Sequence, residues 1–225
     1  GMRDDRLGGD TGQGGIVHSM RLLRSISCRI SGVRMSCIAR SSFEPWITID
    51  WQPSTAFART EGGGFDRVVA TLLVTDIVES TARVLELGDG RWRDLLARHD
   101  QAVRAVLDRF RGREVATTGD GFVAMFDGAE RAIHAAEEIG RAVSGIGLEV
   151  RAAVHTGEIE LEGGNVRGAA MHIAARIADL AEPGQVYASW ATRELLAGSP
   201  IGFTDRGMRE LKGLSEGRRV YLVEP

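Results

Sequence analysis

Cysteine, lysine and long apolar runs are all scarce in this chain of 225 residues. Cys28 and Cys37 are the only cysteines, too few for a disulfide framework or a zinc ligand set, so a cytoplasmic protein is expected. No apolar run reaches the roughly 18–20 residues that a membrane-spanning helix needs, so we expect no membrane partner. The net charge of −3 gives no surplus of positive charge for a polyanion, which argues against a nucleic-acid partner.

Lysine is almost absent, because Lys212 is the single lysine among 28 basic residues and all the others are arginines. A hydrophobic fraction of 43% and a charged fraction of 26% are nevertheless typical of a soluble globular protein. The length suits one ordinary domain with some excess. In a chain that otherwise uses arginine, the one retained lysine is an informative residue.

The first 65 residues show no sustained hydrophobic period. Gly1 before Met2 resembles a residue left by tag cleavage. Residues 20–40 mix arginines with scattered apolar residues, which suits an amphipathic helix, a crude targeting segment or translated upstream sequence without a selected fold. The sequence EGGG at 61–64 is typical of a flexible linker. We therefore expect a poorly structured extension over 1–65 and a folded domain over 66–225.

From residue 66 onward, segments typical of strands and helices alternate. The apolar, β-branched run VVATLLV at 68–74 predicts a buried central strand. Apolar residues spaced by three and four predict helices, and an Asp-Gly pair predicts a hairpin. The predicted helices are 90–110, 129–144 and 168–181; the predicted strands are 113–117, 122–126, 148–155, 158–161, 186–189, 201–205, 208–212 and 218–223.

The predicted strands 148–155 and 158–161 are expected to form a hairpin around Thr156-Gly157. The order β-α-β-β-α-β, with additional C-terminal strands, predicts an α+β fold with a ferredoxin-like core. In this arrangement we expect an antiparallel sheet with its helices on one face.

Two aspartates are candidates for a metal site. Asp76 ends the central strand, and Asp120 lies at the tip of the hairpin between the next two strands. The first and second core strands are close neighbours in a ferredoxin-like sheet, so the two carboxylates can converge. Two carboxylates with few other ligands suit Mg²⁺ or Mn²⁺, which keep several waters and bind substrate phosphates. A turn aspartate and a helix N-cap are alternative interpretations that spacing alone leaves open.

Ser80 and Thr81 follow the central strand at the start of the next helix. Backbone N–H groups at a helix start attract phosphate, so this turn is a candidate phosphate site. Helix capping by the two hydroxyls is an equal alternative.

Five motifs resemble those of class III adenylate and guanylate cyclase catalytic domains. Their order and spacing follow the family from residue 66 to the end of the chain, and the fourth matches an actinobacterial-type branch with histidine in the helix. The motifs are TDIVEST at 75–81, TGDGF at 118–122, HTGE at 155–158, MHIAAR at 171–176 and LKG at 211–213.

The resemblance implies an adenylate cyclase that converts ATP into 3′,5′-cyclic AMP and pyrophosphate. Two ions per site, Mg²⁺ or Mn²⁺, are implied to bind Asp76 and Asp120, with the Ile77 carbonyl as an additional ligand. One ion activates the ribose 3′-hydroxyl for attack on the α-phosphate. The family also implies a homodimer with two equivalent sites, one subunit supplying the carboxylates of each site and the other the remaining groups.

Three further residues correspond to family positions that contact the nucleotide. Arg176 matches the arginine that stabilises charge on the α-phosphate, a role that suits its planar and permanently charged group. Lys212 matches the lysine that binds the terminal phosphates, the alternative being a solvated lysine on an edge strand. His172 replaces the usual asparagine of this helix and can donate a hydrogen bond to the ribose, or can simply pack on the helix.

The base-reading positions depart from the family. Ala116 replaces the lysine that reads adenine, and the acidic residue expected of a guanylate cyclase is also absent there. Asn165 takes the partner position, where its amide still offers donors and acceptors. Losing one hydrogen bond to the base costs about 1–3 kcal/mol of discrimination. Two alternatives therefore stand beside adenylate cyclase: a weak or silent homologue that binds nucleotide or dimerises, and a purine nucleotide cyclase of relaxed specificity.

The helix at 168–181 is apolar nearly all round its circumference. Such a helix must be covered on both sides. Its own sheet and a partner subunit share this cover in one interpretation, and its own subunit supplies all of it in the other.

Overall fold

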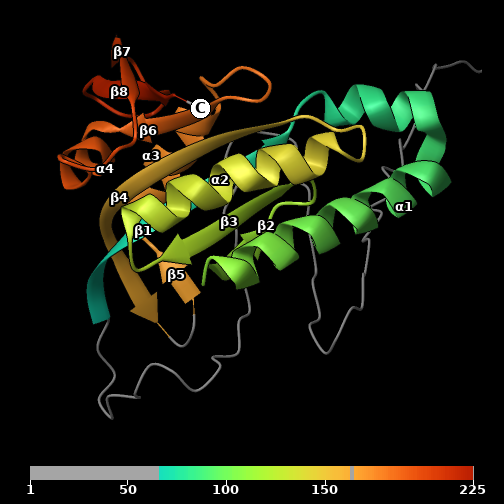
Figure 1. The fold of residues 1–225 in the computed structure, drawn as a ribbon, viewed down its shortest axis with the longest axis horizontal. Coiled ribbons are helices and arrows are strands. Elements are labelled where there is room, and N and C mark those ends of the chain that lie inside the picture. Colours follow the sequence, from blue (N-terminus) through green and yellow to red (C-terminus); the bar gives the residue numbers. More distant parts are fainter. Residues whose placement is uncertain (1–65, 163–164, 225) are drawn as a thin grey trace, which may run out of the picture. The chain divides into compact units, whose positions relative to one another are not determined.

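The computed structural model describes residues 66–162 and 165–224, so the predicted extension over 1–65 lies outside the described residues (Figure 1). The described part is an α+β domain with an eight-stranded sheet of order β2-β3-β1-β4-β6-β8-β7 and β5 paired to β4. None of the helices in these ranges has the length and hydropathy to cross a lipid bilayer. The strands are β1 (Asp66–Ile77), β2 (Arg113–Thr117), β3 (Gly121–Phe126), β4 (Val150–Glu162), β5 (Asn165–Arg167), β6 (Val186–Ser189), β7 (Phe203–Arg209) and β8 (Arg218–Val223).

The central strand β1 lies between β3 and β4 and is antiparallel to both. The ferredoxin-like core and the extra C-terminal strands are confirmed. The sheet is not wholly antiparallel, because β4 and β6 are parallel. This parallel pair is possible because α3 lies between the two strands in the chain, as a parallel connection requires a crossover.

Four helices pack on this sheet: α1 (Ser80–Arg109), α2 (Ala129–Ser144), α3 (Ala169–Ala178) and α4 (Trp190–Leu195). The helix α1 begins ahead of the predicted residue 90 and bends at Gly88, whose backbone is not helical (φ 75°, ψ 158°). Figure 1 shows this bend in the green helix. Gly88 adopts the left-handed region without the steric cost that a Cβ would add, so one helical stretch precedes the predicted helix. The short α4 was not predicted.

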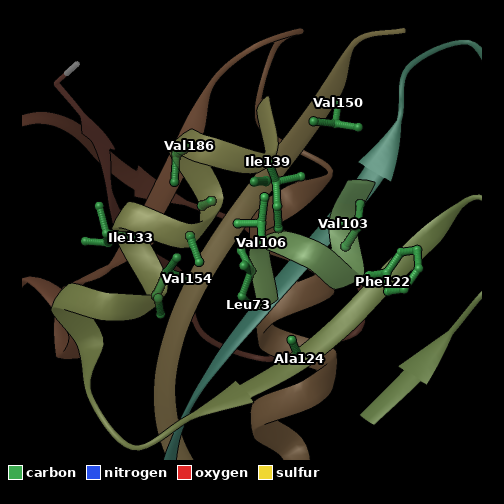
Figure 2. Packing of buried hydrophobic residues seen from close by; sticks show 14 of the residues in the cluster. Leu73, Val103, Val106, Phe122, Ala124, Ile133, Ile139, Val150, Val154 and Val186 are labelled. Carbon is green, nitrogen blue, oxygen red and sulfur yellow. The ribbon is translucent and has the colours of Figure 1, made fainter. Parts of the chain in front are cut away.

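Helices cover both faces of the sheet, so the prediction of helices on one face is wrong. Side chains alternate along β1, and Leu73 packs with α1 and α2 on one face, as Figure 2 shows around Val103, Ile133 and Ile139. Leu72 belongs to a second buried cluster on the opposite face, which includes residues of α3. The continuous apolar run of β1 has this cause, because a strand with both faces buried shows no polar alternation.

The strand β4 runs straight through Thr156-Gly157, so the hairpin predicted there is wrong. Residues of β4 pair with β1 along the whole length from Asp66↔Leu161 to Ile77↔Val150. Gly157 serves close packing instead, because a Cβ at this position would lie 3.0 Å from the Cβ of Ala170 on α3. Glycine within a strand often marks such a close approach rather than a turn.

The C-terminal strands also differ from the prediction. One strand, β7, replaces the two predicted over 201–205 and 208–212, and its pairing with β8 is irregular between Asp205 and Met208. Lys212 consequently lies in the loop between β7 and β8, and not on a strand. A local bulge accounts for the change of pattern that suggested two strands.

Candidate active site

The end of β1 and the β2–β3 turn bring Asp76 and Asp120 together. Asp76 is the register partner of Gly121, the residue after Asp120. The N–H of Ile77 donates to the backbone carbonyl of Asp120 at 3.2 Å, which fixes the turn against the strand end. The negative charge of Asp120 acts on Asp76, where it is one cause of a raised pKa. The two carboxylates therefore form one acidic pair at this edge of the sheet.

The glycine after Asp120 is required by the local geometry. A Cβ at Gly121 would lie 2.6 Å from the carbonyl oxygen of Thr75 and 2.7 Å from Oγ1 of Thr118. The turn is closed by the Thr118 N–H, which donates to the Gly121 carbonyl at 2.9 Å. The Gly-Asp-Gly sequence thus holds Asp120 beside β1, with Gly119 in the left-handed region (φ 97°).

Ser80 contacts the acidic pair directly. It is the first residue of α1, and its hydroxyl donates a hydrogen bond to the carboxylate of Asp120. Glu79, the residue before it, is the helix N-cap in a left-handed conformation (φ 54°, ψ 32°) and makes no side-chain capping hydrogen bond. Ser80 therefore orients a carboxylate here, and the capping alternative does not apply to it.

A cavity of about 340 Å³ adjoins this site. Thr81 lines it together with Ser80, Gly119 and Asp120 at the acidic end. Side chains from both sides of the α1 bend form the rest of the wall, which is apolar. These are Val84, Leu85, Trp92 and Leu96.

Arg151 is a site residue that the sequence did not reveal. It is the register partner of Asp76 on β4, and its Nε and Nη2 donate to Oδ2 of Asp76 at 3.0 Å and 2.7 Å. Burial raises the pKa of Asp76, the hydrogen bonds from Arg151 oppose this, and the charge of Asp120 adds to the rise. An arginine beside the apolar residues at 152–154 was the available signal, but its target depends on strand register.

The helix α3 carries Arg176 and His172 at the surface. Nη1 of Arg176 lies 3.1 Å from Oδ2 of Asp179, the residue that ends the helix. Asp179 also faces Arg151, whose Nη2 lies 3.5 Å from Oδ1. A continuous series of ion pairs therefore joins Asp76, through Arg151 and Asp179, to Arg176. His172 is exposed on the same helix.

The remaining predicted site residues lie elsewhere on the domain. Ala116 is buried on β2, only 4% exposed, within the cluster that α3 covers. Asn165 begins β5, where its register partner is Glu162 of β4. Lys212 is exposed in the β7–β8 loop. The structure thus joins the carboxylates, Ser80 and the two arginines through hydrogen bonds and ion pairs. The metal-binding, substrate-binding and catalytic roles of all the predicted site residues stay predictions.

His155 of the HTGE motif is buried and contacts a neighbouring strand. It is 8% exposed on β4, and its Nδ1 lies 2.8 Å from the hydroxyl of Ser189 on β6. Burial, with a smaller contribution from the nearby charge of Arg218, lowers its pKa to about 4. A neutral histidine therefore links the two parallel strands beneath α3.

The donor set fits a hard divalent cation. Among the described residues, no three His, Cys, Asp or Glu side chains gather where they could bind a metal ion. The acidic pair offers oxygen ligands alone, as Mg²⁺ and Mn²⁺ prefer, and leaves positions for water and phosphate oxygens. Burial and the charge of Asp120 make Asp76 favour a nearby positive charge, which Arg151 supplies in this structure.

Two known proteins are similar in sequence to part of this chain. No family model matches the chain. A Rhizobium meliloti protein named "Putative adenylate cyclase 3" is 28% identical over 169 residues, which are 71% of this chain and 29% of that protein. An uncharacterised Mycobacterium tuberculosis protein is 40% identical over 102 residues, covering 44% of this chain and 40% of its own. The chain therefore spans less than two thirds of the length of either relative.

Solved structures match most of the domain. The adenylyl cyclase CyaB from P. aeruginosa has a TM-score of 0.67 at 20% identity, over 72% of this chain and 96% of its own. The adenylate/guanylate cyclase/hydrolase from Silicibacter pomeroyi has a TM-score of 0.62 at 27% identity, over 72% and 99%. The guanylyl cyclase Cya2 has a TM-score of 0.63 at 24% identity, over 71% and 93%.

The sheet order, the helices on both faces and the acidic pair at the end of β1 define a nucleotidyl cyclase fold. The domain therefore has the fold of class III adenylate/guanylate cyclase catalytic domains, and its five motifs resemble theirs.

Proposed function

We propose that the protein is an adenylate cyclase that converts ATP into 3′,5′-cyclic AMP and pyrophosphate at a homodimer interface. The observation that carries this proposal is the convergence of Asp76 and Asp120, with Ser80 and Arg151 as their hydrogen-bond donors. In the reaction, a bond forms between the ribose 3′-oxygen and the α-phosphorus. The bond from that phosphorus to the bridging oxygen breaks, and pyrophosphate leaves.

Asp76 and Asp120 are proposed to hold two divalent ions, Mg²⁺ or Mn²⁺. When bound, such ions lower the pKa of the 3′-hydroxyl and offset the charge of the triphosphate. Ser80 keeps the Asp120 carboxylate in one orientation through its hydrogen bond. The N-terminus of α1 next to this serine presents backbone N–H groups, which favour phosphate oxygens.

The arginines are proposed to act on the phosphates. The Arg151 guanidinium lies beside Asp76, so a triphosphate bound there would meet a planar donor that suits phosphate oxygens. Arg176 is proposed to stabilise the charge that develops at the α-phosphate of a nucleotide held on the carboxylates of the other subunit. Lys212 and His172 are proposed to contact the terminal phosphates and the ribose.

Two features support a homodimer. Met171 and Ile173 on α3 are only partly buried by the rest of the domain, although Ala170, Ala174 and Ile177 are covered. The exposed positions of His172 and Lys212 would also suit contact with a nucleotide held on the carboxylates of a second subunit. In a two-fold dimer these contacts would occur twice.

The test is incubation of the purified protein with ATP and Mn²⁺, with the product identified by mass spectrometry. We expect cyclic AMP from the wild type and none above background from Asp120→Ala. Glu138→Gln is a control for the loss of one carboxylate, since it removes a carboxylate on α2 that takes no part in the acidic pair. No cyclic AMP at high protein concentration would contradict the proposal, and tight binding of a non-hydrolysable ATP analogue without turnover would favour a silent homologue.

Relaxed purine specificity is the second candidate, favoured by Ala116. This residue is buried and apolar, so it offers the base no side-chain hydrogen bond. Comparison of ATP and GTP turnover decides the matter. A preference for ATP above about tenfold, or about 1.4 kcal/mol, would exclude relaxed specificity.

A further inference from the structure

Asp179 lies between Arg151 and Arg176 of its own chain and uses a different oxygen for each. Its Oδ2 accepts from Nη1 of Arg176 at 3.1 Å, and its Oδ1 lies 3.5 Å from Nη2 of Arg151. Nη1 of Arg151 is also 3.5 Å from the backbone carbonyl of Asp179. One residue thus offers Arg151 two acceptors while holding Arg176.

Arg151 presently makes its shorter contacts to Asp76, at 2.7 Å and 3.0 Å, both to Oδ2. A divalent cation at Asp76 would compete with the guanidinium for the same carboxylate. A guanidinium that loses its partner in a partly buried site is unfavourable, because its donors are left unsatisfied. Arg151 and Asp76 are each 30% exposed, so water replaces the lost contact only in part.

We propose that Asp179 is a positioning residue that accepts Arg151 when Asp76 takes up a divalent cation. Its carboxylate and carbonyl already lie within reach, so the guanidinium moves between two anionic partners without leaving the site. Arg176 keeps its own oxygen of the same carboxylate during this movement. The inference rests on the metal site of the proposed function.

The test measures Mn²⁺ affinity directly, by electron paramagnetic resonance of free Mn²⁺ in titrations of the full chain. Asp179→Asn should raise the Mn²⁺ dissociation constant about threefold to tenfold, the range expected for coupled neighbours. Arg151→Ala removes the competitor and should lower the dissociation constant. In the Arg151→Ala background, Asp179→Asn should change it less than about twofold.

Glu138→Gln is the matched control for charge. Glu138 likewise bridges two arginines with separate oxygens, Arg109 through Oε1 and Arg141 through Oε2, but it lies on α2. Glu138→Gln should therefore leave Mn²⁺ affinity unchanged. Asp179→Glu keeps a carboxylate and should bind Mn²⁺ within about twofold of the wild type, and thermal melts will show that each variant is folded.

Two results would overturn the inference alone. One is unchanged Mn²⁺ affinity in Asp179→Asn; the other is an equal loss with and without Arg151, which would make Asp179 a distant charge and not a partner of that arginine. Failure of the wild type to bind Mn²⁺, even with an ATP analogue, would instead overturn the metal site and the proposed function together.

Discussion

The carboxylate half of the site (Asp76, Asp120 and Ser80) and its α3 half (His172 and Arg176) are built in different ways. Backbone pairing between β1 and β3, and a turn that excludes side chains at Gly121, fix the carboxylate half. The α3 half consists of side chains on a helix surface, where Arg176 is 39% exposed and paired with Asp179. The difference teaches that the backbone of the sheet positions the acidic pair, whereas a side-chain ion pair on an accessible helix surface positions Arg176.

Asp120→Ala is the largest expected effect and removes the carboxylate half. Cyclic AMP formation should fall about a hundredfold or more, because charge stabilisation at the reacting phosphate is lost. The circular dichroism spectrum should be unchanged, because the turn is held by backbone hydrogen bonds. An activity above a tenth of the wild type would show that the acidic pair is not central to the chemistry.

Low pH should lower the free energy of unfolding, because His155, which lies beneath the α3 half, is buried in its neutral form. Its pKa is lowered to about 4 in the folded protein, so the unfolded chain takes up a proton at higher pH than the native state does. The stabilising contribution is therefore complete above about pH 6.5 and falls by about 3 kcal/mol as the pH drops to about 4.

Urea unfolding at a series of pH values measures this loss in the wild type and in His155→Asn. The variant should show a shallower dependence over the same window, since the other titrating groups are common to both. Equal slopes would remove His155 as the cause.

Gly157→Ala tests how closely α3 must approach the sheet. The added Cβ would lie 3.0 Å from both the Cβ of Ala170 and Nε2 of His155. We expect the free energy of unfolding to fall by about 1–3 kcal/mol, the usual cost of overpacking. Gly140→Ala on α2 is the control, where a Cβ meets nothing within 4 Å and should stabilise by about 0.5–1 kcal/mol. Equal effects at both positions would contradict a close α3 contact.

Glu79→Gly is the smallest effect and concerns backbone strain in the carboxylate half. A left-handed residue with a Cβ costs about 1–2 kcal/mol, and the flexibility of glycine in the unfolded chain offsets part of the gain. The free energy of unfolding should therefore rise by about 0.5–1 kcal/mol. Arg111→Gly, at the other non-glycine residue with positive φ among the described residues (57°), should give a similar gain. A loss of stability at Glu79 alone would show that its side chain compensates the strain.

The sequence predicted correctly those elements whose hydrophobic or turn pattern lies within their own residues. The apolar run of β1, the Asp-Gly turn at Asp120 and the helix α2 all appear where the sequence indicated. The placement of Asp76 beside Asp120 followed from strand adjacency in the expected fold.

The errors came from features that depend on distant partners. Gly157 suggested a turn, but its reason is the contact with Ala170 on α3. Arg151 gained its role from the β1–β4 register, which no local pattern gives. Asp179 became relevant only once α3 had been placed on the face opposite α1 and α2.

The most direct measurement asks whether the two halves act across a dimer interface. Asp120→Ala and Arg176→Ala, carrying different affinity tags, would be co-expressed and the mixed dimers purified. Each parent should be inactive, and the mixed dimer should recover about half of the wild-type rate, because one of its two sites combines the unmutated Asp120 of one chain with the unmutated Arg176 of the other. Activity no higher than that of the parents would contradict a site shared between two protomers.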